Sequence, residues 1–256
     1  MGLNLIRWWN IRKAKGKVLE IGCGTGRNMS YYNFSQVSKL IAIDSVKEMI
    51  DVARTKIPSS LDDPSQVQLK QMNAHDLREF ADNSFDTVVD TFGLCSYQSP
   101  HNVLHELSRV LNKANPDARI ILIEHGHAHY DWLNNSLNSR GQQHAHDWGC
   151  VWNLPIDQIV QEAGLEIVSM SRFHMGTTYV IEARPAPPGA PHARSLHEYH
   201  SHYQPPPRPD DPATHRHVEV HPPAELDDHG HSHGHPHPPA APAHGPSPSS
   251  SQQHPR

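Results

Sequence analysis

Cysteine is scarce in this sequence, and no two cysteines lie close together. Among 256 residues only Cys23, Cys95 and Cys150 occur, and none belongs to a C-x-x-C pair. Small secreted domains held together by disulfides carry many cysteines at short spacings, whereas proteins of reducing compartments carry few disulfides. We therefore expect a reducing compartment and no disulfide framework.

Long apolar runs and an excess of basic charge are also missing. No apolar stretch approaches the roughly 18 to 20 residues that a membrane-spanning helix needs. Up to residue 185 there are 18 Lys and Arg residues against 20 Asp and Glu residues, and the formal net charge of the whole chain is −5. A protein dedicated to nucleic acid usually carries a basic face. The sequence predicts no membrane span in this chain and no nucleic-acid partner.

Aliphatic periodicity is missing after about residue 185, where Pro and His dominate. The chain has 23 residues of each type, and runs such as QPPPRP at 204–209 and HGHSHGHPH at 229–237 lie in this part. Such a segment buries too little apolar surface to offset the entropy lost on ordering. We expect one folded domain over residues 1–185 and a disordered tail rich in Pro and His over residues 186–256.

The histidines at 229–237 have two interpretations. Alternating His-Gly and His-Ser units are flexible imidazole donors, which could hold zinc or nickel. Low-complexity drift without a selected role accounts for the same run. The sequence leaves both open, and zinc or nickel bound there is expected to be adventitious.

Residues 1–17 contain no acidic residue and five basic ones, a composition compatible with a mitochondrial presequence. Their apolar positions at 3, 6, 9 and 11 instead predict an amphipathic helix that leads directly into the next apolar stretch, with Gly16 as its stop. We favour the helix, because cleaving this segment would remove part of the fold.

The most informative stretch is the run VLEIGCGTGRN at 18–28. Val18, Leu19 and Ile21 suit a buried strand of a parallel sheet. Three glycines at alternating positions follow, and they let the backbone turn sharply and lie against a ligand: Gly22, Gly24 and Gly26. The pattern predicts a loop that cradles a nucleotide.

The third glycine of the dinucleotide-binding fingerprint is absent. A G-x-G-x-x-G loop beginning at Gly22 needs glycine at position 27, where Arg27 stands. The pattern E-x-G-x-G-x-G that begins at Glu20 instead resembles the first motif of class I S-adenosylmethionine-dependent methyltransferases, of the methyltransferase type 11 kind. The resemblance extends from residue 17 to about residue 184. It implies S-adenosylmethionine as the cofactor, with its methionine part held by Glu20, Gly22, Cys23, Gly24 and Gly26.

A second acid, Asp44, lies 18 residues beyond Gly26, at the end of an apolar strand over 39–44. A carboxylate at this place accepts both hydroxyl protons of a ribose, and capping of the next helix is the alternative. Ser45 is expected to cap that helix beside the cofactor. After the strand at 67–72 the family commonly has D-A-x-x-L near the adenine. Asn73 and Ala74 stand there, and an amide gives a weaker contact than a charge.

The segments NSFD at 83–86 and TVVDTF at 87–92 resemble the fourth strand of small-molecule methyltransferases and its entry. Ligands of open parallel sheets lie at the carboxyl ends of the strands. We therefore expect Asp90 and Thr91 beside the cofactor and the transferred methyl group, and Phe92 beside the acceptor.

Further apolar segments complete the expected fold. A helix over 103–111 precedes a fifth strand over 119–124, and the last two strands cover 165–170 and 177–182. In the family that the chain resembles, the last strand inserts antiparallel beside the fifth. The resulting fold class is α/β: a Rossmann-like seven-stranded sheet with an antiparallel last strand and helices on both faces.

The segments after the fifth strand carry a more particular resemblance. EHG at 124–126, HAHDWGC at 144–150 and WN at 152–153 look like those of fungal mitochondrial methyltransferase-like proteins related to ubiquinone/menaquinone-type methyltransferases, and less closely like thiol methyltransferases. In class I methyltransferases this insert often helps to form the acceptor pocket. With Phe92, the expected aromatic lining is Tyr130, Trp148 and Trp152.

Three histidines in this part are candidate general bases, because imidazole titrates near neutral pH: His125, His144 and His146. Polar groups that satisfy one another under a lid are the alternative for any one of them. With Asp147 they could also hold zinc or iron. Methyl transfer to a soft acceptor needs no metal and the spacing matches no established zinc pattern, so we expect no metal.

The function that the sequence favours is direct in-line methyl transfer from S-adenosylmethionine to a small or lipophilic acceptor. Two alternatives remain open: a non-catalytic S-adenosylmethionine-binding assembly factor, and a metal-handling protein that acts through the His-rich tail. The resemblance implies a mitochondrial location, whereas the lack of a convincing targeting or membrane segment favours the cytoplasm. Family members usually have a segment before the first helix that folds over the cofactor, and we expect this cap to be missing from the chain.

Overall fold

The computed structural model describes residues 2–187, apart from the side chains of residues 142, 145, 146 and 148. The predicted tail at 186–256, with its histidine run at 229–237, therefore lies outside the described residues except at its first two positions. Within the described part, no helix is both long and apolar enough to span a membrane.

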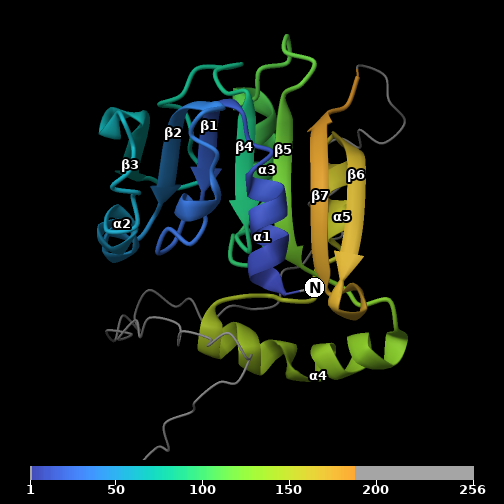
Figure 1. The fold of residues 1–256 in the computed structure, drawn as a ribbon. Helices are drawn as coiled ribbons and strands as arrows, with labels where there is room; N and C mark the ends of the chain where they lie inside the picture. Colours follow the sequence, from blue (N-terminus) through green and yellow to red (C-terminus); the bar gives the residue numbers. More distant parts are fainter. Residues whose placement is uncertain (1, 188–256) are drawn as a thin grey trace, which may run out of the picture. The chain divides into compact units, whose positions relative to one another are not determined.

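Seven strands form one sheet in the order β3-β2-β1-β4-β5-β7-β6 (Figure 1). The strands β1 to β5 pair in parallel, and β7 lies antiparallel between β5 and β6. This confirms the expected sheet with its inserted antiparallel last strand. The strand bounds are β1 Gly16–Ile21, β2 Val37–Asp44, β3 Val67–Gln71, β4 Thr87–Thr91, β5 Arg119–His125, β6 Leu165–Phe173 and β7 Thr178–Pro185.

Helices cover both faces of the sheet, as expected. One face carries α1 (Leu3–Ile11) and α2 (Lys47–Arg54), and the other carries α3 (Pro100–Val110) and α5 (Ile156–Glu162). A longer helix, α4 (Asp131–Trp148), lies across the carboxyl ends of the central strands (Figure 1). Three single turns of 3-10 helix complete the fold: η1 Met29–Tyr31, η2 Pro64–Gln66 and η3 His174–Gly176.

The central strands are apolar on both faces because each face is covered by helices. Side chains alternate between the faces of a strand. In β1, Val18 packs in the core layer of α1, whereas Leu19 and Ile21 pack in the layer of α3 and α5. The near-continuous apolar run in the sequence is thus explained by a strand that is buried on two sides.

The first helix packs differently from the sequence prediction. Ile6, Asn10 and Ile11 are buried, whereas Trp9 is 59% exposed, so the prediction that Trp9 lies on the packing face was wrong. The side-chain amide of Asn10 donates to the Ile6 carbonyl at 2.8 Å, so a polar residue takes the buried position. The helix also ends at Ile11 rather than at Gly16, which begins β1.

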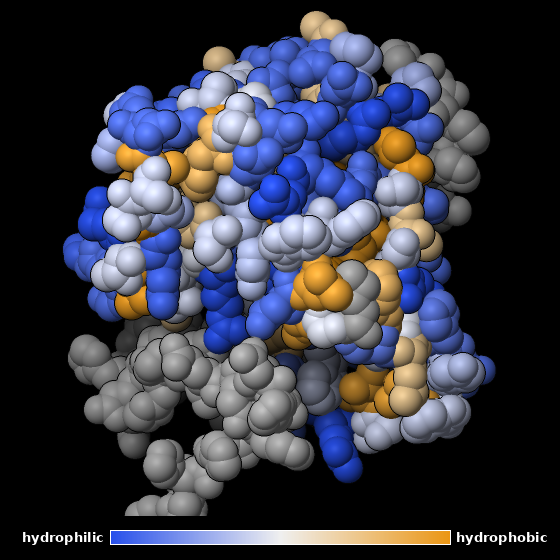
Figure 2. Space-filling model, viewed as in Figure 1, coloured by the Kyte–Doolittle hydropathy of each residue, from blue (hydrophilic) through white to orange (hydrophobic). Residues whose placement is uncertain are grey.

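The face of the molecule seen in Figure 2 is largely hydrophilic, with apolar side chains in small patches. Scattered exposed apolar side chains are usual on folded proteins. In the described part of the chain the most exposed large ones include Trp9 and Trp132.

The core predicts a clear difference between two leucines. Leu104 in α3 is fully buried, whereas Leu5 in α1 is 51% exposed. Leu104→Ala is expected to lower the free energy of unfolding by about 2 to 5 kcal/mol, because it leaves a cavity, and Leu5→Ala by less than about 0.5 kcal/mol. Urea unfolding of both variants measures this, and equal effects would contradict the assigned core.

Candidate active site

The carboxyl ends of β1 and β4 form the edge at which the order of the strands reverses. From β1 the chain builds outward through β2 to β3, and β4 then returns to the other side of β1. Ile21, the last residue of β1, lies opposite Asp90 in this parallel pair. Ligands of open α/β sheets bind at such a switch point. The glycine loop begins there, at Gly22.

The glycine loop needs its glycines for its backbone. Gly22, Gly24 and Gly26 have φ angles of +54°, +52° and +78°, in the left-handed region that other residues rarely adopt. A Cβ added to Gly26 would lie 3.0 Å from the Cα of Ala53 in α2, so this glycine also lets the loop approach the helix. A Cβ added to Gly24 would meet nothing within 4 Å, so this part of the loop faces open space.

Asp44 fastens the loop to the end of β2. Its Oδ2 accepts from the Gly24 amide at 2.9 Å and its Oδ1 accepts from the Val46 amide at 2.9 Å. The half-buried carboxylate therefore begins α2 and also orients the loop. The prediction that Ser45 caps this helix was wrong: the N-cap is Val46, and the Asp44 carboxylate takes the amide instead. Ser45 is exposed at the same edge.

Glu20 lies inside the fold beneath the loop. It is 1% exposed, and its two carboxyl oxygens accept from Asn28 Nδ2 at 2.9 Å and from the Tyr32 hydroxyl at 2.7 Å. Burial raises the pKa of Glu20 to about 7, against the opposing effect of these two hydrogen bonds and of Arg7. Because both oxygens are engaged within the chain, Glu20 braces the loop from behind.

Arg7 reaches this edge from α1, and the sequence analysis missed it. Its Nη1 donates to Asn28 Oδ1 at 2.5 Å and to Thr91 Oγ1 at 3.0 Å. Its guanidinium also lies 5.0 Å from the centre of the Phe92 ring. Arg7 follows the buried Ile6 in an amphipathic helix, which is the only sequence signal for it, and its contacts depend on how α1 docks.

The end of β4 turns sharply at Phe92. Its φ of +60° is unusual for a bulky residue, and such strained positions cluster at functional sites. The Phe92 ring lies 4.3 Å, centre to centre, from the imidazole of His125 at the end of β5. Two predicted residues from different strands are therefore brought together.

Burial favours the neutral form of two imidazoles in this region, His125 and His144. Burial, followed by the effects of His144, Arg7 and His174, lowers the pKa of His125 to about 4. Burial also lowers the pKa of His144, whose ring stacks on Trp152 at a centre distance of 3.8 Å. The structure thus joins His125, His144, Phe92 and Trp152 in a cluster at the carboxyl ends of β4 and β5, which we call the aromatic cluster.

Other predicted acceptor-site residues lie apart from this cluster or outside the description. Tyr130 is 52% exposed and stacks on Trp132 at the start of α4. The side chains of His146 and Trp148 are not among those that the structure describes. Their predicted roles stay predictions.

Three predicted cofactor residues have local roles in the structure. Asn73 is exposed, and its Oδ1 accepts from the His75 amide at 3.0 Å, so it turns the chain after β3. Ala74 is buried. Cys23 is buried with Ala42 and Ala53, and burial raises the pKa of its thiol. All three lie at the cofactor edge of β1 to β3, and contact with the adenine or the methionine part stays a prediction.

Asp90 lies deeper than the sequence suggested. It is fully buried, as is Glu124 of β5, which the sequence analysis did not assign to the site. Burial raises the pKa of both carboxyls well above the ordinary range; Glu20 raises that of Asp90 further, and Asp90 raises that of Glu124. The Glu-His pair at the end of the fifth strand was the signal that could have pointed to Glu124.

Metal ligands do not gather at this edge. Among the described residues, no three His, Cys, Asp or Glu side chains are placed to hold a metal ion.

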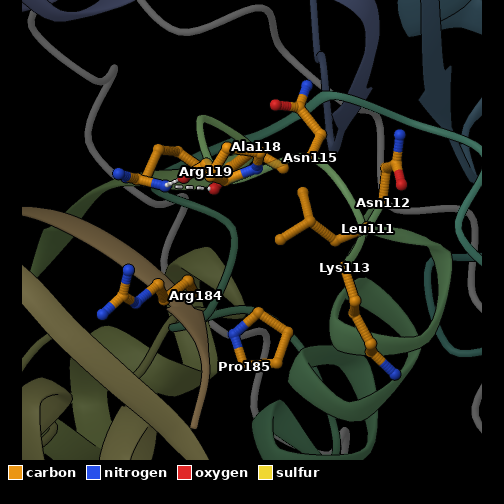
Figure 3. Close-up of a pocket in the computed structure, with 9 residues that line it drawn as sticks. Leu111, Asn112, Lys113, Asn115, Ala118, Arg119, Arg184 and Pro185 are labelled. Carbon is orange, nitrogen blue, oxygen red and sulfur yellow. Dashed lines mark hydrogen bonds between the residues drawn. The ribbon is translucent and has the colours of Figure 1, made fainter. Parts of the chain in front are cut away.

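A hollow lies at the opposite end of the strands. Arg119 at the start of β5, Arg184 near the end of β7 and Lys113 line it (Figure 3). Arg119 donates to the Pro116 and Ala118 carbonyls, and Arg184 pairs with Glu166 at 2.8 Å. Both guanidinium groups are therefore bound to neighbouring groups of the surface, and the hollow lies at the other end of the strands from the glycine loop.

A comparison with protein families identifies the kind of domain that contains the glycine loop. Residues 19–114, which hold the glycine loop, Asp44 and β4, match the family described as methyltransferase domain. This chain contains a methyltransferase domain. Its cofactor is S-adenosylmethionine. The open loop at Gly24 and the carboxylate of Asp44 beside it fit a ligand of that kind.

Two curated relatives match this chain over part of their own length. Methyltransferase OMS1, mitochondrial, of Saccharomyces cerevisiae is 33% identical over 191 residues, which are 70% of this chain and 40% of that protein. Thiol S-methyltransferase TMT1B of Homo sapiens is 36% identical over 103 residues, 38% of this chain and 40% of that protein. The chain thus spans about 40% of the length of each.

A solved structure shares the fold. A methyltransferase from Bacillus halodurans superimposes with a TM-score of 0.59 at 18% identity, over 73% of this chain and all of that one. At this identity the likeness concerns the fold alone.

Two glycines with the same backbone constraint provide a test of the loop. Gly24→Ala is expected to weaken S-adenosylmethionine binding about tenfold or more, because a methyl group enters ligand space and overpacking costs about 1 to 3 kcal/mol. Gly164, which follows α5, also has a positive φ of +76° and nothing within 4 Å of an added Cβ. Both variants should lose about 1 to 2 kcal/mol of stability.

Isothermal titration gives the affinities and urea unfolding the stabilities of both variants. Gly164→Ala should bind as the unmodified protein does. Unchanged affinity in Gly24→Ala would contradict the placement of the cofactor at the loop.

Proposed function

We propose that this protein transfers the methyl group of S-adenosylmethionine to a small or lipophilic acceptor by direct in-line displacement. The observation that carries the proposal is that β4 joins two halves of one site. Its last residue, Thr91, belongs to the network of Arg7 and Asn28 behind the glycine loop. Phe92, which follows directly, belongs to the aromatic cluster. When bound, the cofactor supplies an electrophilic methyl group. Orientation of the two reactants contributes as much as roughly 7 to 11 kcal/mol to such reactions.

On the donor side, the chain has a group for each polar part of the cofactor. Arg7 is a half-buried cation that can bind the carboxylate of the methionine part of the cofactor. Its neighbours Asn28 and Thr91 hold its guanidinium group in place. Asp44 has the position of a ribose acceptor. Glu20 contributes to cofactor binding through the loop that it supports. The other residues proposed to contact the cofactor are Gly22, Cys23, Gly24, Gly26, Ser45, Asn73, Ala74 and Asp90.

On the acceptor side, α4 and the aromatic cluster form the wall of the site. Phe92 and Trp152 offer flat apolar surfaces, which suits a small or lipophilic molecule. Tyr130 and Trp148 belong to the proposed lining, and His144 and His146 are proposed as proton acceptors beside His125. The residues of the aromatic cluster come from the ends of β4 and β5, from α4 and from the segment that follows α4.

The state of His125 narrows the acceptor chemistry. With a pKa of about 4 the imidazole is uncharged, so it does not repel a cationic donor, but it is a weak base. A weak base favours an acceptor that ionises by itself near neutral pH, and a thiol, with an ordinary pKa near 8.5, does so more readily than a phenol. The human relative is a thiol S-methyltransferase by name. We therefore place a thiol first among acceptors, and a quinol second.

The location and domain limits follow the same relatives. The yeast relative is mitochondrial by name, and we propose a mitochondrial location for this protein, with the cytoplasm as the alternative. The catalytic domain is proposed to cover residues 1–185, followed by the His-rich tail at 186–256.

Asp44 gives a test of the donor side. Asp44→Asn is expected to weaken the binding of S-adenosylmethionine and of S-adenosylhomocysteine by the same factor, about tenfold, because both carry the ribose and a hydrogen bond to a charged group is worth about 1.5 to 3 kcal/mol. Asp51→Asn, at an exposed acid of α2, is the control and should change neither affinity. A loss confined to one ligand would contradict the ribose role.

The acceptor is tested by product detection. The full chain is incubated with S-adenosylmethionine and a panel of a thiol, a quinol and a peptide, and methylated products are identified by mass spectrometry. With the thiol, kcat/KM should rise with pH through the pKa of the acceptor, about 8.5, and show no step near pH 6.5, because His125 stays neutral throughout. No product with any acceptor, together with normal cofactor binding, would favour the non-catalytic alternative.

A further inference from the structure

Two carboxyl groups lie side by side in the interior at the switch point. Asp90 of β4 is paired with Leu122 of β5, and Glu124 follows two residues later on the same face. Both side chains are fully buried. Among the described residues, none of the four carboxyl oxygens has a hydrogen-bond partner. Buried polar groups are nearly always satisfied, so an unsatisfied pair calls for an explanation.

Asp90 of this pair borders the glycine loop. A Cβ added to Gly93 would lie 2.2 Å from Asp90 Oδ1, and one added to Gly22 would lie 2.7 Å from the Tyr97 hydroxyl and 3.9 Å from Asp90 Oδ1. Asp90 and Tyr97 therefore lie directly against the first glycine of the loop. Glu20 is equally buried under the same loop, but hydrogen bonds satisfy both of its oxygens. The Tyr97 hydroxyl and the Gly93 and Leu94 amides lie near Asp90 and Glu124 without forming such bonds.

The surroundings favour the protonated form of both carboxyls when no cation is near. Burial raises both pKa values, Glu20 raises that of Asp90 further, and Asp90 raises that of Glu124. The Tyr97 hydroxyl and the Gly93 and Leu94 amides oppose this only partly. Titratable and charged groups from the neighbouring elements face this region: Glu20 of β1, Asp44 of β2, Cys95 and Tyr97 after β4, and Arg7 of α1.

We propose, resting on the function proposed above, that the Asp90–Glu124 pair recognises the charge of the methyl donor. S-adenosylmethionine carries a sulfonium cation, and S-adenosylhomocysteine has a neutral thioether in its place. Binding of the cation causes the pair to release a proton to solvent, and the resulting carboxylate faces the positive charge in a region of low dielectric. After transfer the charge is gone and the pair takes up a proton again, which weakens the hold on the product.

The test measures how many protons the protein releases when each ligand binds. Isothermal titration of the full chain with each ligand, in two buffers of different ionisation enthalpy at the same pH, gives the number of protons released on binding. S-adenosylmethionine should release more protons than S-adenosylhomocysteine, by up to about one. Its affinity relative to that of the product should rise with pH, by up to about tenfold per pH unit.

Neutral variants test whether the pair is the source. Asp90→Asn and Glu124→Gln keep the shape of the protonated acids and should abolish the difference in proton release, bringing the two affinities about tenfold closer. Asp82→Asn, at an exposed acid in the turn before β4, is the control and should keep the difference.

A measurement without ligand checks the protonation of the pair. Because folding raises its pKa values, the pair stabilises the protein at low pH, and this contribution is lost as pH rises through the raised values. In urea unfolding from pH 5 to 9, the two neutral variants should show a smaller loss of stability than the unmodified protein.

The outcomes separate the two proposals. Equal proton release by both ligands, or an unchanged difference in the neutral variants, would overturn this inference alone. Binding of neither ligand by the unmodified protein would overturn the proposed function, and this inference with it.

Discussion

The parallel pairing of β1 with β4 is the interaction on which the rest of the site depends. The pair sets Ile21 opposite Asp90, so the glycine loop and the sharp turn at Phe92 leave the sheet side by side. Arg7 then bridges the two segments through Asn28 and Thr91. A slip of this register by one residue would turn the side chains of β4 to the opposite faces, and would separate Thr91 from the network.

Three kinds of buried ionisable side chain lie around the pair of strands β1 and β4. Glu20 is buried and satisfied, so it acts as a brace. Asp90 and Glu124 are buried and unsatisfied, which leaves them responsive to a cation. His125 is buried as well, but burial favours its neutral form at neutral pH, because desolvation penalises the charged state of an acid and of a base alike. Burial therefore favours the neutral form of the acids Asp90 and Glu124 and of the base His125 in the same site.

Much of the fold was predictable because its signals are local. The seven strands follow from short apolar runs, and the loop at Gly22 to Gly26 follows from positive φ angles that favour glycine. The sequence predictions were wrong where two neighbouring residues could each take the same role. Ser45 is a good capping residue, but Asp44 is one position earlier and takes the Val46 amide. Trp9 is apolar and lies three residues after the buried Ile6, but it is exposed. Asn10 is buried instead, with its side-chain amide bonded to the Ile6 carbonyl.

The sequence alone was enough to predict the glycine loop, the acid at the end of β2 and the class of the domain, since each of these depends on consecutive residues. Which side chains meet across the sheet was decided by the tertiary structure. Arg7 contacts Thr91, Phe92 contacts His125, and Asp90 lies near Glu124, although these partners are distant in the chain. Their contacts and their protonation depend on strand register, helix docking and depth of burial, which no short stretch of sequence specifies.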